Sequence, residues 1–547
     1  MKKLCKGELL RLILLTVALM LPVLSSTTVG SCKMPIWGRV VLNLGVFMTI
    51  ASIFVRIGVH RVAKLMMMPL VIIAFVYAGF VWITGYDITF HAVCGVLDTN
   101  PREAYEYIQN PPILIGIGIG VFVLGSIGYL LACKWHHPWV TKPIVVRKRL
   151  LYVCAFMGFL CLGSWSATGG DFNNIYPLRL YNFTAEHLKK LPHVKKCYAN
   201  TRELYKYQGP KINDKPETYI LIIGESARAQ NWDLYGYHRE TNPVVRSWRD
   251  KNPHNFVLFP RCVSAGRVTR VSVTSFLSTE TCEHFSSFYK KPGFVHVFRK
   301  AGFKTFVASA QPENGFYGGL QNMLLKDAEI TKFWKHPPMD MGLLPYLDQY
   351  LKDPAPKKLI ILHINGSHYK YTARYTKDFE RYTKRGTEHE ELFSTYDNSL
   401  LYTDTLIGKV LERAKNHANP AMVLYTSDHG ENLNDFDDKN YQHGSKSINR
   451  FEINVPMICY FNKKFTNQKA NAVKNIYANR DRQLSHDVIA HTFLGLANLV
   501  DKNIYYPEFD ISSKKFGPAE MYFAEKPNES INFKDLAPHI WPGPAKK

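Results

Sequence analysis

The amino-acid sequence predicts a protein of two parts: an N-terminal bundle of five transmembrane helices, then an α/β domain with a mostly parallel central sheet covered by helices. Two observations lead to this fold class. The first third of the chain holds five long apolar runs, and beyond about residue 215 short β-rich runs alternate with polar stretches of helical spacing. The length of 547 residues also exceeds that of one ordinary domain.

The apolar runs predict the membrane part. Each approaches the ~20 residues that a helix needs to cross a bilayer, and charges inside the runs are nearly absent. A cleaved signal peptide would account for the first run only, so the other four favour a polytopic protein. The runs cover roughly residues 9–26, 37–55, 65–84, 112–133 and 150–166.

The charges between the runs predict the orientation. Lys and Arg gather at the amino end and in the second and fourth connections, which we therefore expect in the cytoplasm. The third connection has four acidic residues against one Arg, so we expect it on the outer side. An odd number of spans then puts everything after about residue 168 outside the cytoplasm. The net charge of +23 suits contact with anionic lipid head groups or an anionic glycan and does not require nucleic acid; a merely solvated basic surface is the alternative.

The exported part should begin with linker helices over residues 169–215, followed by a catalytic domain over 216–547. Within that domain, buried β-rich runs alternate with helical segments, which predicts an α/β sheet covered on both faces. Ligands of such sheets gather where strands end at their carboxyl edge. The runs are "TYILIIGE", "KTFVASA", "KLIILHI", "AMVLYTSDHG" and "VPMICYF".

Three of these strand ends carry side chains that bind metals. Glu225 closes the first run, His368 follows the third, and Asp428 and His429 close the fourth. Any one of them alone is explained by capping at the end of a strand. Together they supply the nitrogen and oxygen ligands that zinc accepts, so the sequence favours a metal site at this edge.

Four of the ten cysteines lie in the exported part, at positions 197, 262, 282 and 459. Four thiols in an oxidising compartment allow three pairings, and the sequence does not choose among them. We favour a bridge between Cys262 and Cys282, because these two bracket the hydroxyl-rich segment "AGRVTRVSVTSFLS".

The order of motifs resembles one family. "GESARAQNWDLYGYHRETNP", "GSH", "TYDNSLLYTD" and "SDHGE", behind five spans, are similar to the phosphoethanolamine transferases of Gram-negative envelopes, in the alkaline phosphatase and sulfatase superfamily. The resemblance covers essentially the whole chain and implies an alkaline-phosphatase-like domain. Ala265 and Ser275 stand where lipid A-modifying members have cysteines, and "FVASAQPENGFYGG" lacks the cysteine-rich loop and lysine of that branch. The chain therefore looks nearer to the lipopolysaccharide-core or periplasmic-glucan branch.

The resemblance also implies a role for particular residues. Its zinc ligands match Glu225, Asp428 and His429, and its threonine nucleophile, which completes the ligand set, matches Thr269. One or two zinc ions are implied, with manganese less favoured. Other hydroxyls compete with Thr269 for the nucleophile position, namely Ser264, Ser272, Thr274 and Ser275. An ordinary N-cap is the alternative explanation of a hydroxyl-rich helix start.

Three further residues match family positions around the donor. His368 and His443 match histidines that bind the phosphate or donate protons, and Glu103 matches an acidic residue near the ethanolamine ammonium. For each of them an ordinary surface role is the alternative.

The function implied is transfer of phosphoethanolamine from phosphatidylethanolamine to a sugar of lipopolysaccharide, at core heptose or lipid A, or to a periplasmic glucan. The transfer would pass through a phospho-threonine intermediate. The protein would be a multi-pass protein of the bacterial inner membrane with its catalytic domain in the periplasm. Two alternatives stay open: a glycerol-phosphate transferase of the lipoteichoic acid synthase type, and a non-catalytic envelope-binding protein.

Overall fold

The computed structural model describes residues 176–536, except for 312, 314–319, 335–338, 384–385, 436–440, 445–447 and 527–528, together with single positions before residue 176. The five predicted spans, apart from a few single positions, and Glu103 lie outside the described residues. Within the described part of the chain, no helix is long and apolar enough to cross a membrane. Two compact units divide the chain, residues 1–96 with 104–189 and residues 97–103 with 190–547.

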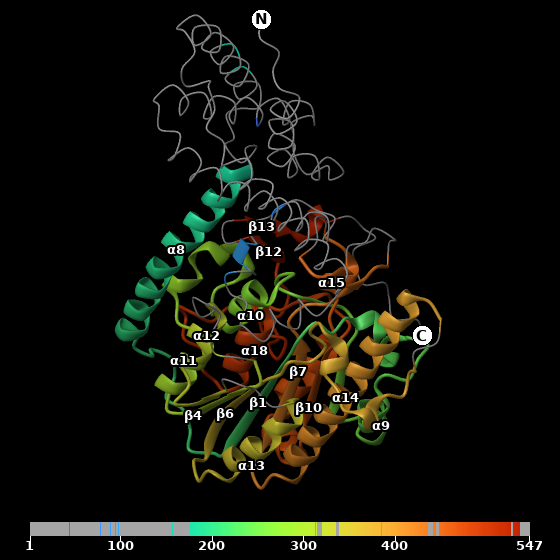
Figure 1. The fold of residues 1–547 in the computed structure, drawn as a ribbon. Coiled ribbons are helices and arrows are strands. Elements are labelled where there is room, and N and C mark those ends of the chain that lie inside the picture. Colours follow the sequence, from blue (N-terminus) through green and yellow to red (C-terminus); the bar gives the residue numbers. More distant parts are fainter. Residues whose placement is uncertain are drawn as a thin grey trace, which may run out of the picture. The chain divides into compact units, whose positions relative to one another are not determined.

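The second unit is built on a seven-stranded sheet with strand order β2-β10-β7-β1-β6-β4-β5 (Figure 1). Strand β10 is antiparallel to both its neighbours, and the other pairs are parallel. The mostly parallel sheet that the sequence predicts is therefore confirmed. The strands are β1 (Glu217–Gly224), β2 (Phe256–Phe259), β4 (Lys304–Ser309), β5 (Ile330–Phe333), β6 (Lys357–His363), β7 (Ala421–Ser427) and β10 (Met457–Phe461).

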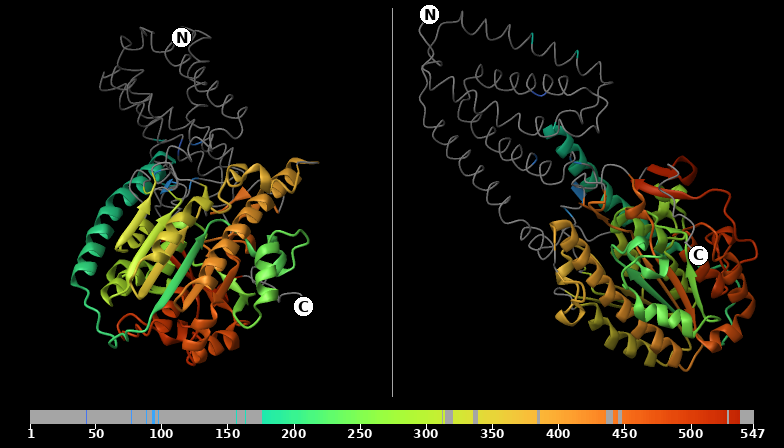
Figure 2. Two further views of the ribbon diagram at one scale, coloured as in Figure 1. Left: turned by 90° about the horizontal axis from the view of Figure 1, so that it is seen from below. Right: turned by 90° about the vertical axis from the view of Figure 1, so that its right-hand side faces the viewer.

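Helices cover both faces of this sheet, as the two turned views show (Figure 2). Alternate residues of β1 enter two different cores: Tyr219, Leu221 and Ile223 pack on one side, and Ile220 and Ile222 on the other. This alternation follows from the two-residue period of a strand, and it explains why β1 is apolar throughout.

The remaining elements complete the unit. The helices are α8 (Tyr176–Leu204), α9 (Pro243–Lys251), α10 (Thr269–Leu277), α11 (Phe294–Lys300), α12 (Leu320–Leu325), α13 (Leu344–Lys352), α14 (Glu388–Asn416), α15 (Arg450–Ile453), α16 (Lys463–Gln468), α17 (Ala470–Asn479) and α18 (Val488–Leu496). Short strand pairs are β3 (Cys262–Val263) with β11 (Leu484–Ser485), β8 (Asn432–Leu433) with β9 (Tyr441–Gln442), and β12 (Tyr522–Lys526) with β13 (Glu529–Asn532). The 3-10 helices are η4 (Ala229–Asn231), η5 (Asp233–Tyr235), η6 (Cys282–Lys290), η7 (Asp340–Leu343), η8 (Tyr371–Ala373), η9 (Lys377–Phe379), η10 (Pro507–Phe509) and η11 (Phe533–Asp535).

The carboxyl-terminal part of α8 is tied to the second unit by one buried carboxylate. Tyr198 donates its hydroxyl to Asp327, and Arg202 Nε lies 2.9 Å from Asp327 Oδ1. The helix falls within the segment 169–215, for which the sequence predicted linker helices.

The loop that contains the motif "YGYHRETNP" is hydrogen-bonded to α14 through Asp397. The carboxylate of Asp397 accepts hydrogen bonds from Tyr237 (3.0 Å), Arg239 (2.9 Å) and Asn231 (2.7 Å). These bonds fix the loop that follows Glu225 against α14, so this motif has a structural role here.

The favoured disulfide between Cys262 and Cys282 is wrong, because both thiols are free and buried. Cys262 Sγ lies 3.6 Å from the sulfur of Met457 in the large core, whereas Cys282 Sγ points to the carbonyl of Ala265, at 3.8 Å, in a separate apolar cluster. Strand β3 and turn η6 therefore direct the two side chains into different cores.

Candidate metal centre and active site

The register of two parallel strands brings the carboxylates together. Gly224 of β1 is paired with Ser427 of β7, and Glu225 and Asp428 are the next residues along each strand. The amide of Asp428 also donates to the carbonyl of Gly224, at 3.1 Å. Both carboxylates are fully buried at the carboxyl edge of the sheet.

His429 and Thr269 complete this cluster. The Nε2 atom of His429 lies 3.4 Å from Glu225 Oε1 and 3.3 Å from Asp428 Oδ2. The hydroxyl of Thr269, the first residue of α10, donates to Glu225 Oε2 at 3.1 Å and lies 3.3 Å from His429 Nε2. One oxygen or nitrogen of each group therefore points toward a common centre.

The atoms in this cluster fit a metal ion. Asp428 Oδ2 is buried without a hydrogen-bond partner, and such an atom is costly unless a cation or a donor occupies the space beside it. Burial, and then repulsion from Glu225, raises the pKa of the Asp428 carboxyl. A bound cation would offset this repulsion, so the two carboxylates, the imidazole and the hydroxyl are suited to hold a metal ion.

Backbone and hydroxyl donors hold the two carboxylates in place. Asp428 Oδ1 accepts from the amides of Ser226, at 3.1 Å, and His429, at 2.7 Å. Glu225 Oε1 accepts the hydroxyl of Ser226 at 2.7 Å. Ser226 has a positive φ of 55°, which turns the chain sharply after β1. The turn places its amide and its hydroxyl on two different carboxylates.

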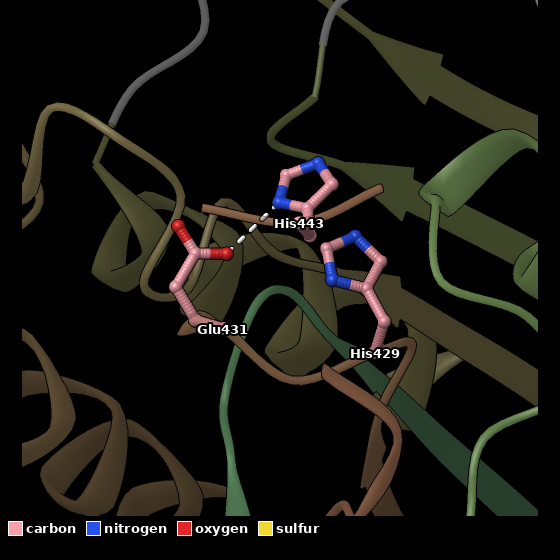
Figure 3. A group of neighbouring side chains, drawn as sticks. All are labelled: His429, Glu431 and His443. Atoms are coloured by element: carbon pink, nitrogen blue, oxygen red, sulfur yellow. Dashed lines mark hydrogen bonds and ion pairs between the residues drawn. The ribbon is translucent and has the colours of Figure 1, made fainter. Parts of the chain in front are cut away.

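A second cluster lies beside the first and contains His429, Glu431 and His443 (Figure 3). Glu431 is fully buried; one of its oxygens lies 2.8 Å from His443 Nδ1, and the other accepts the hydroxyl of Tyr371 at 2.8 Å. The rings of His429 and His443 are 4.0 Å apart between centroids. Since a carboxylate only accepts, Nδ1 of His443 carries the proton of this contact.

His368 lies near this cluster without joining the ligand set. Its ring centroid is 6.4 Å from that of His443, and its Nδ1 lies 2.6 Å from the carbonyl of Tyr369. The loop that carries it is bound to Glu225, because the amide of Ser367 donates to the Glu225 carbonyl at 2.9 Å. Among the described residues, neither of the two groups that could hold a metal ion includes His368.

The competing hydroxyls near Thr269 are all used by nearby backbone. Each donates to a carbonyl: Ser264 to Gly266 (2.8 Å), Ser272 to Asp428 (2.6 Å), Thr274 to Arg270 (2.6 Å) and Ser275 to Val271 (3.0 Å). Of the five hydroxyls, Thr269 is the one that contacts side-chain atoms of the cluster, namely Glu225 Oε2 and His429 Nε2.

Sequence reasoning missed three residues that shape the site. Gln311 donates to Glu225 Oε2 at 2.7 Å, and Arg228 donates to the carbonyl of Glu431 at 3.0 Å. The guanidinium of Arg228 also lies 4.6 Å from the ring centroid of Phe451. Glu431 stands inside the motif "SDHGE", which is a signal that could have been followed; Gln311 carries no comparable signal.

Comparisons with known proteins identify the family and its relatives. Residues 217–499 match the Sulfatase family model. Phosphoethanolamine transferase EptC of Escherichia coli K12 is 27% identical over 335 residues, which are 56% of each chain, and EptA of the same strain is 25% identical over 473 residues, 79% of this chain and 81% of EptA. The chain thus spans about half the length of several curated relatives that it matches, EptC among them.

Solved structures share the fold. The integral membrane lipooligosaccharide phosphoethanolamine transferase A from Neisseria meningitidis aligns with a TM-score of 0.69 at 20% identity, covering 93% of this chain and 98% of that one. The periplasmic domain of EptC from E. coli, in complex with Zn, aligns with a TM-score of 0.55 at 24% identity, covering 60% of this chain and 95% of that one.

Proposed function

This chain belongs to the sulfatase family, and from that premise we propose that it moves phosphoethanolamine from phosphatidylethanolamine to a sugar hydroxyl of an envelope glycolipid or periplasmic glucan. One observation carries the proposal: the Thr269 hydroxyl lies within 3.3 Å of both Glu225 and His429, at the edge where two parallel strands end. The named phosphoethanolamine transferases among the relatives support the choice of transferred group.

The metal in this proposal is zinc, as one or two ions, held by Glu225, Asp428, His429 and Thr269. Imidazole nitrogen together with carboxylate oxygen suits zinc, and manganese is less favoured by this set. When bound, zinc lowers the pKa of the threonine hydroxyl and offsets negative charge on the phosphoryl oxygens. The structural relative described as a complex with Zn supports this assignment.

Transfer then takes two displacements at phosphorus. Ionised Thr269 attacks the phosphorus of the donor, the bond from phosphorus to the diacylglycerol oxygen breaks, and phosphoethanolamine stays on Thr269. In the second displacement the acceptor hydroxyl attacks the same phosphorus and Thr269 leaves. The start of α10 directs its amide groups toward the phosphoryl oxygens, where partial positive charge is favourable.

His443 moves the proton in both displacements. Its Nε2 gives a proton to the departing diacylglycerol oxygen and later takes one from the acceptor hydroxyl. In both displacements Glu431 accepts a hydrogen bond from Nδ1–H of His443, at 2.8 Å. This bond orients the imidazole ring and stabilises its charged form. His368 binds a phosphoryl oxygen of the donor, and Glu103 meets the ethanolamine ammonium.

The cellular setting is part of the proposal. The five apolar runs put the protein in the bacterial inner membrane, with the domain that carries Thr269 in the periplasm. The fold shared with an integral membrane protein over 93% of the chain supports this setting. The donor is then a lipid of the same membrane, and the acceptor lies on the periplasmic side.

The test is peptide mass spectrometry of full-length protein in detergent after incubation with phosphatidylethanolamine. We expect a phosphoethanolamine adduct on the peptide of Thr269, absent in Thr269→Ala and present in Ser264→Ala, the matched control whose hydroxyl bonds to the backbone. A glycerol-phosphate adduct formed only with phosphatidylglycerol would move the assignment to the lipoteichoic acid synthase type. Comparison of lipopolysaccharide and glucan masses between a deletion strain and its parent identifies the acceptor.

A further inference from the structure

Gln311 reaches the metal centre from a fourth strand. It lies two residues after β4, which is separated from β1 by β6 alone. The amide of Ala310 donates to the carbonyl of His363 at 2.7 Å, so the backbone before Gln311 continues the pairing of β4 with β6. The carboxyl end of β4 therefore delivers Gln311 to the edge where Glu225 and Asp428 meet.

Two hydrogen bonds fix the orientation of the Gln311 side-chain amide. Its Nε2 donates to Glu225 Oε2 at 2.7 Å and to the carbonyl of Ile364 at 3.2 Å. Both partners only accept, so the amide nitrogen must face them. Ser309 braces the residue from behind, because its hydroxyl donates to the Gln311 carbonyl at 3.0 Å and accepts from the Gln311 amide at 3.2 Å.

The contact falls on the oxygen of Glu225 that Thr269 also uses. Oε2 accepts from Gln311 at 2.7 Å and from Thr269 at 3.1 Å, while Oε1 accepts from Ser226 at 2.7 Å. With both oxygens engaged, rotation of the buried carboxylate would break these hydrogen bonds. The geometry points to Gln311 as a positioning residue that fixes Glu225 for metal binding and for contact with Thr269, an inference that rests on the proposed function.

A neutral donor suits this task. The amide orients the carboxylate without cancelling its charge, so the charge stays available to a cation. A lysine in the same place would bring a competing positive charge, and an aliphatic side chain would leave Oε2 with one donor fewer. Outer contacts of this kind commonly change metal affinity about 10-fold to 100-fold when removed.

The experiment measures zinc affinity of full-length protein in detergent by competition with a chromophoric chelator. We expect Gln311→Met to weaken zinc binding about 10-fold to 100-fold. Ser309→Ala, which removes the brace and leaves the amide in place, should weaken it less. The matched control is Gln468→Met, because Gln468 donates to the carbonyl of Pro216 at 3.3 Å, before the opposite end of β1; it should bind zinc like the parent.

Thermal unfolding with and without zinc separates positioning from general stability. In Gln311→Met we expect the metal-free midpoint to match the parent and the increase caused by zinc to shrink. Zinc affinity equal to the parent, or a lower metal-free midpoint with the full increase from zinc, would overturn the assignment of Gln311 alone. A parent protein that binds no zinc would instead overturn the metal centre of the proposed function and this inference with it.

Discussion

At the scale of single residues, the site depends on which atoms of a side chain are already engaged. Glu431 illustrates this, because Tyr371 and His443 occupy its two oxygens and Arg228 holds its carbonyl. Thr269 differs from the four hydroxyls around it in the same way, through its partners rather than its chemistry. Hydrogen bonding sets the tautomer of an imidazole and the direction of a hydroxyl. It therefore distinguishes side chains of the same chemical type that lie close together.

The role of Glu431 predicts the effect of an amide in its place. Glu431→Gln replaces one acceptor by a donor, so His443 loses the fixed proton on Nδ1. We expect the turnover number for diacylglycerol release to fall about 100-fold or more, the range typical of lost acid–base catalysis. Tyr371→Phe should cost less, since it removes a bond to Glu431 but leaves the imidazole contact.

The control is Glu240→Gln, which alters a carboxylate that is 50% exposed and paired with Arg246 and Arg381. It should keep parental turnover. Turnover in Glu431→Gln equal to that of Glu240→Gln would contradict the role given to Glu431.

Asp487 predicts a pH dependence of stability. Burial raises its pKa to about 7, from an ordinary value of 3.8. The folded state therefore holds the proton more tightly than the unfolded state, and the stability this contributes is full below about pH 4 and is lost as pH rises through 7. Between pH 5.5 and 8 the parent should lose roughly 2 kcal/mol relative to Asp487→Asn, which has no proton to release.

Chemical denaturation at the two pH values measures this difference. Asn at position 487 keeps an oxygen for the amide of Cys282, which donates at 3.0 Å. The matched control is Asp481→Asn, whose side chain is 75% exposed. A difference between the parent and Asp487→Asn that stays constant across the range would refute the argument.

At the scale of elements, the site is formed by loops that pack against the carboxyl ends of the strands. The loop after β6 crosses directly over Glu225, and Asp340 holds it through the amides of Asn365 (2.8 Å) and Gly366 (2.9 Å). Helix α14 stabilises α9 in a similar way, since Asp404 accepts from two amides of its first turn. Elements distant in sequence thus act as caps for one another.

The loop after β6 approaches the end of β1 closely at Gly366. A Cβ at this position would lie 2.6 Å from the carbonyl oxygen of Glu225 and 2.9 Å from its nitrogen, and φ is +50°. Gly366→Ala should therefore displace the loop, cost more than about 2 kcal/mol of folding stability and weaken zinc binding. Left-handed strain alone accounts for about 1 kcal/mol.

Gly236→Ala is the matched control, because Gly236 has a φ of +95° and nothing within 4 Å of its Cβ position. Denaturant unfolding and zinc titration of both variants separate strain from collision. Equal losses in the two variants would mean that the close approach to Glu225 has no effect of its own.

At the scale of the whole molecule, the second unit is stabilised by packing rather than by cross-links. The sheet lies between two large apolar clusters, and Cys262, Cys282 and Cys459 are free and buried within the described part of the chain. Burial raises the pKa of each of these thiols, which makes them poor nucleophiles in the folded state. Their role is that of small apolar side chains.

These thiols predict the result of a peptide map without reductant. After unfolding in alkylating reagent, Cys262 and Cys282 should both be labelled in full, and the unfolding midpoint should be the same with and without dithiothreitol. Reduced protein labelled in parallel gives the reference for complete reaction. A peptide that links the two cysteines would show that Cys262 and Cys282 form a disulfide after all.

Most of the central sheet could be predicted from the sequence, because its signals are local. The β-rich runs that became β1, β4, β6, β7 and β10 are apolar over consecutive residues, and a parallel sheet buried on both faces requires this pattern. Strands β2 and β5 were missed. They are four residues each at the two edges of the sheet, and β5 is largely exposed, so neither has a long apolar run.

The residues of the candidate site were likewise predicted only in part from the sequence. The sequence by itself determined the residue types at the strand ends, with Glu225, Asp428 and His429 closing two apolar runs. Thr269 was singled out by the family resemblance, and the structure places it at the start of α10. Only the tertiary structure decided that Gln311 braces a carboxylate 86 positions away, that Glu431 orients His443, and that two cysteines stay apart. Strand ends follow from the local pattern of apolar residues, whereas these contacts depend on register and side-chain direction, which long-range packing sets.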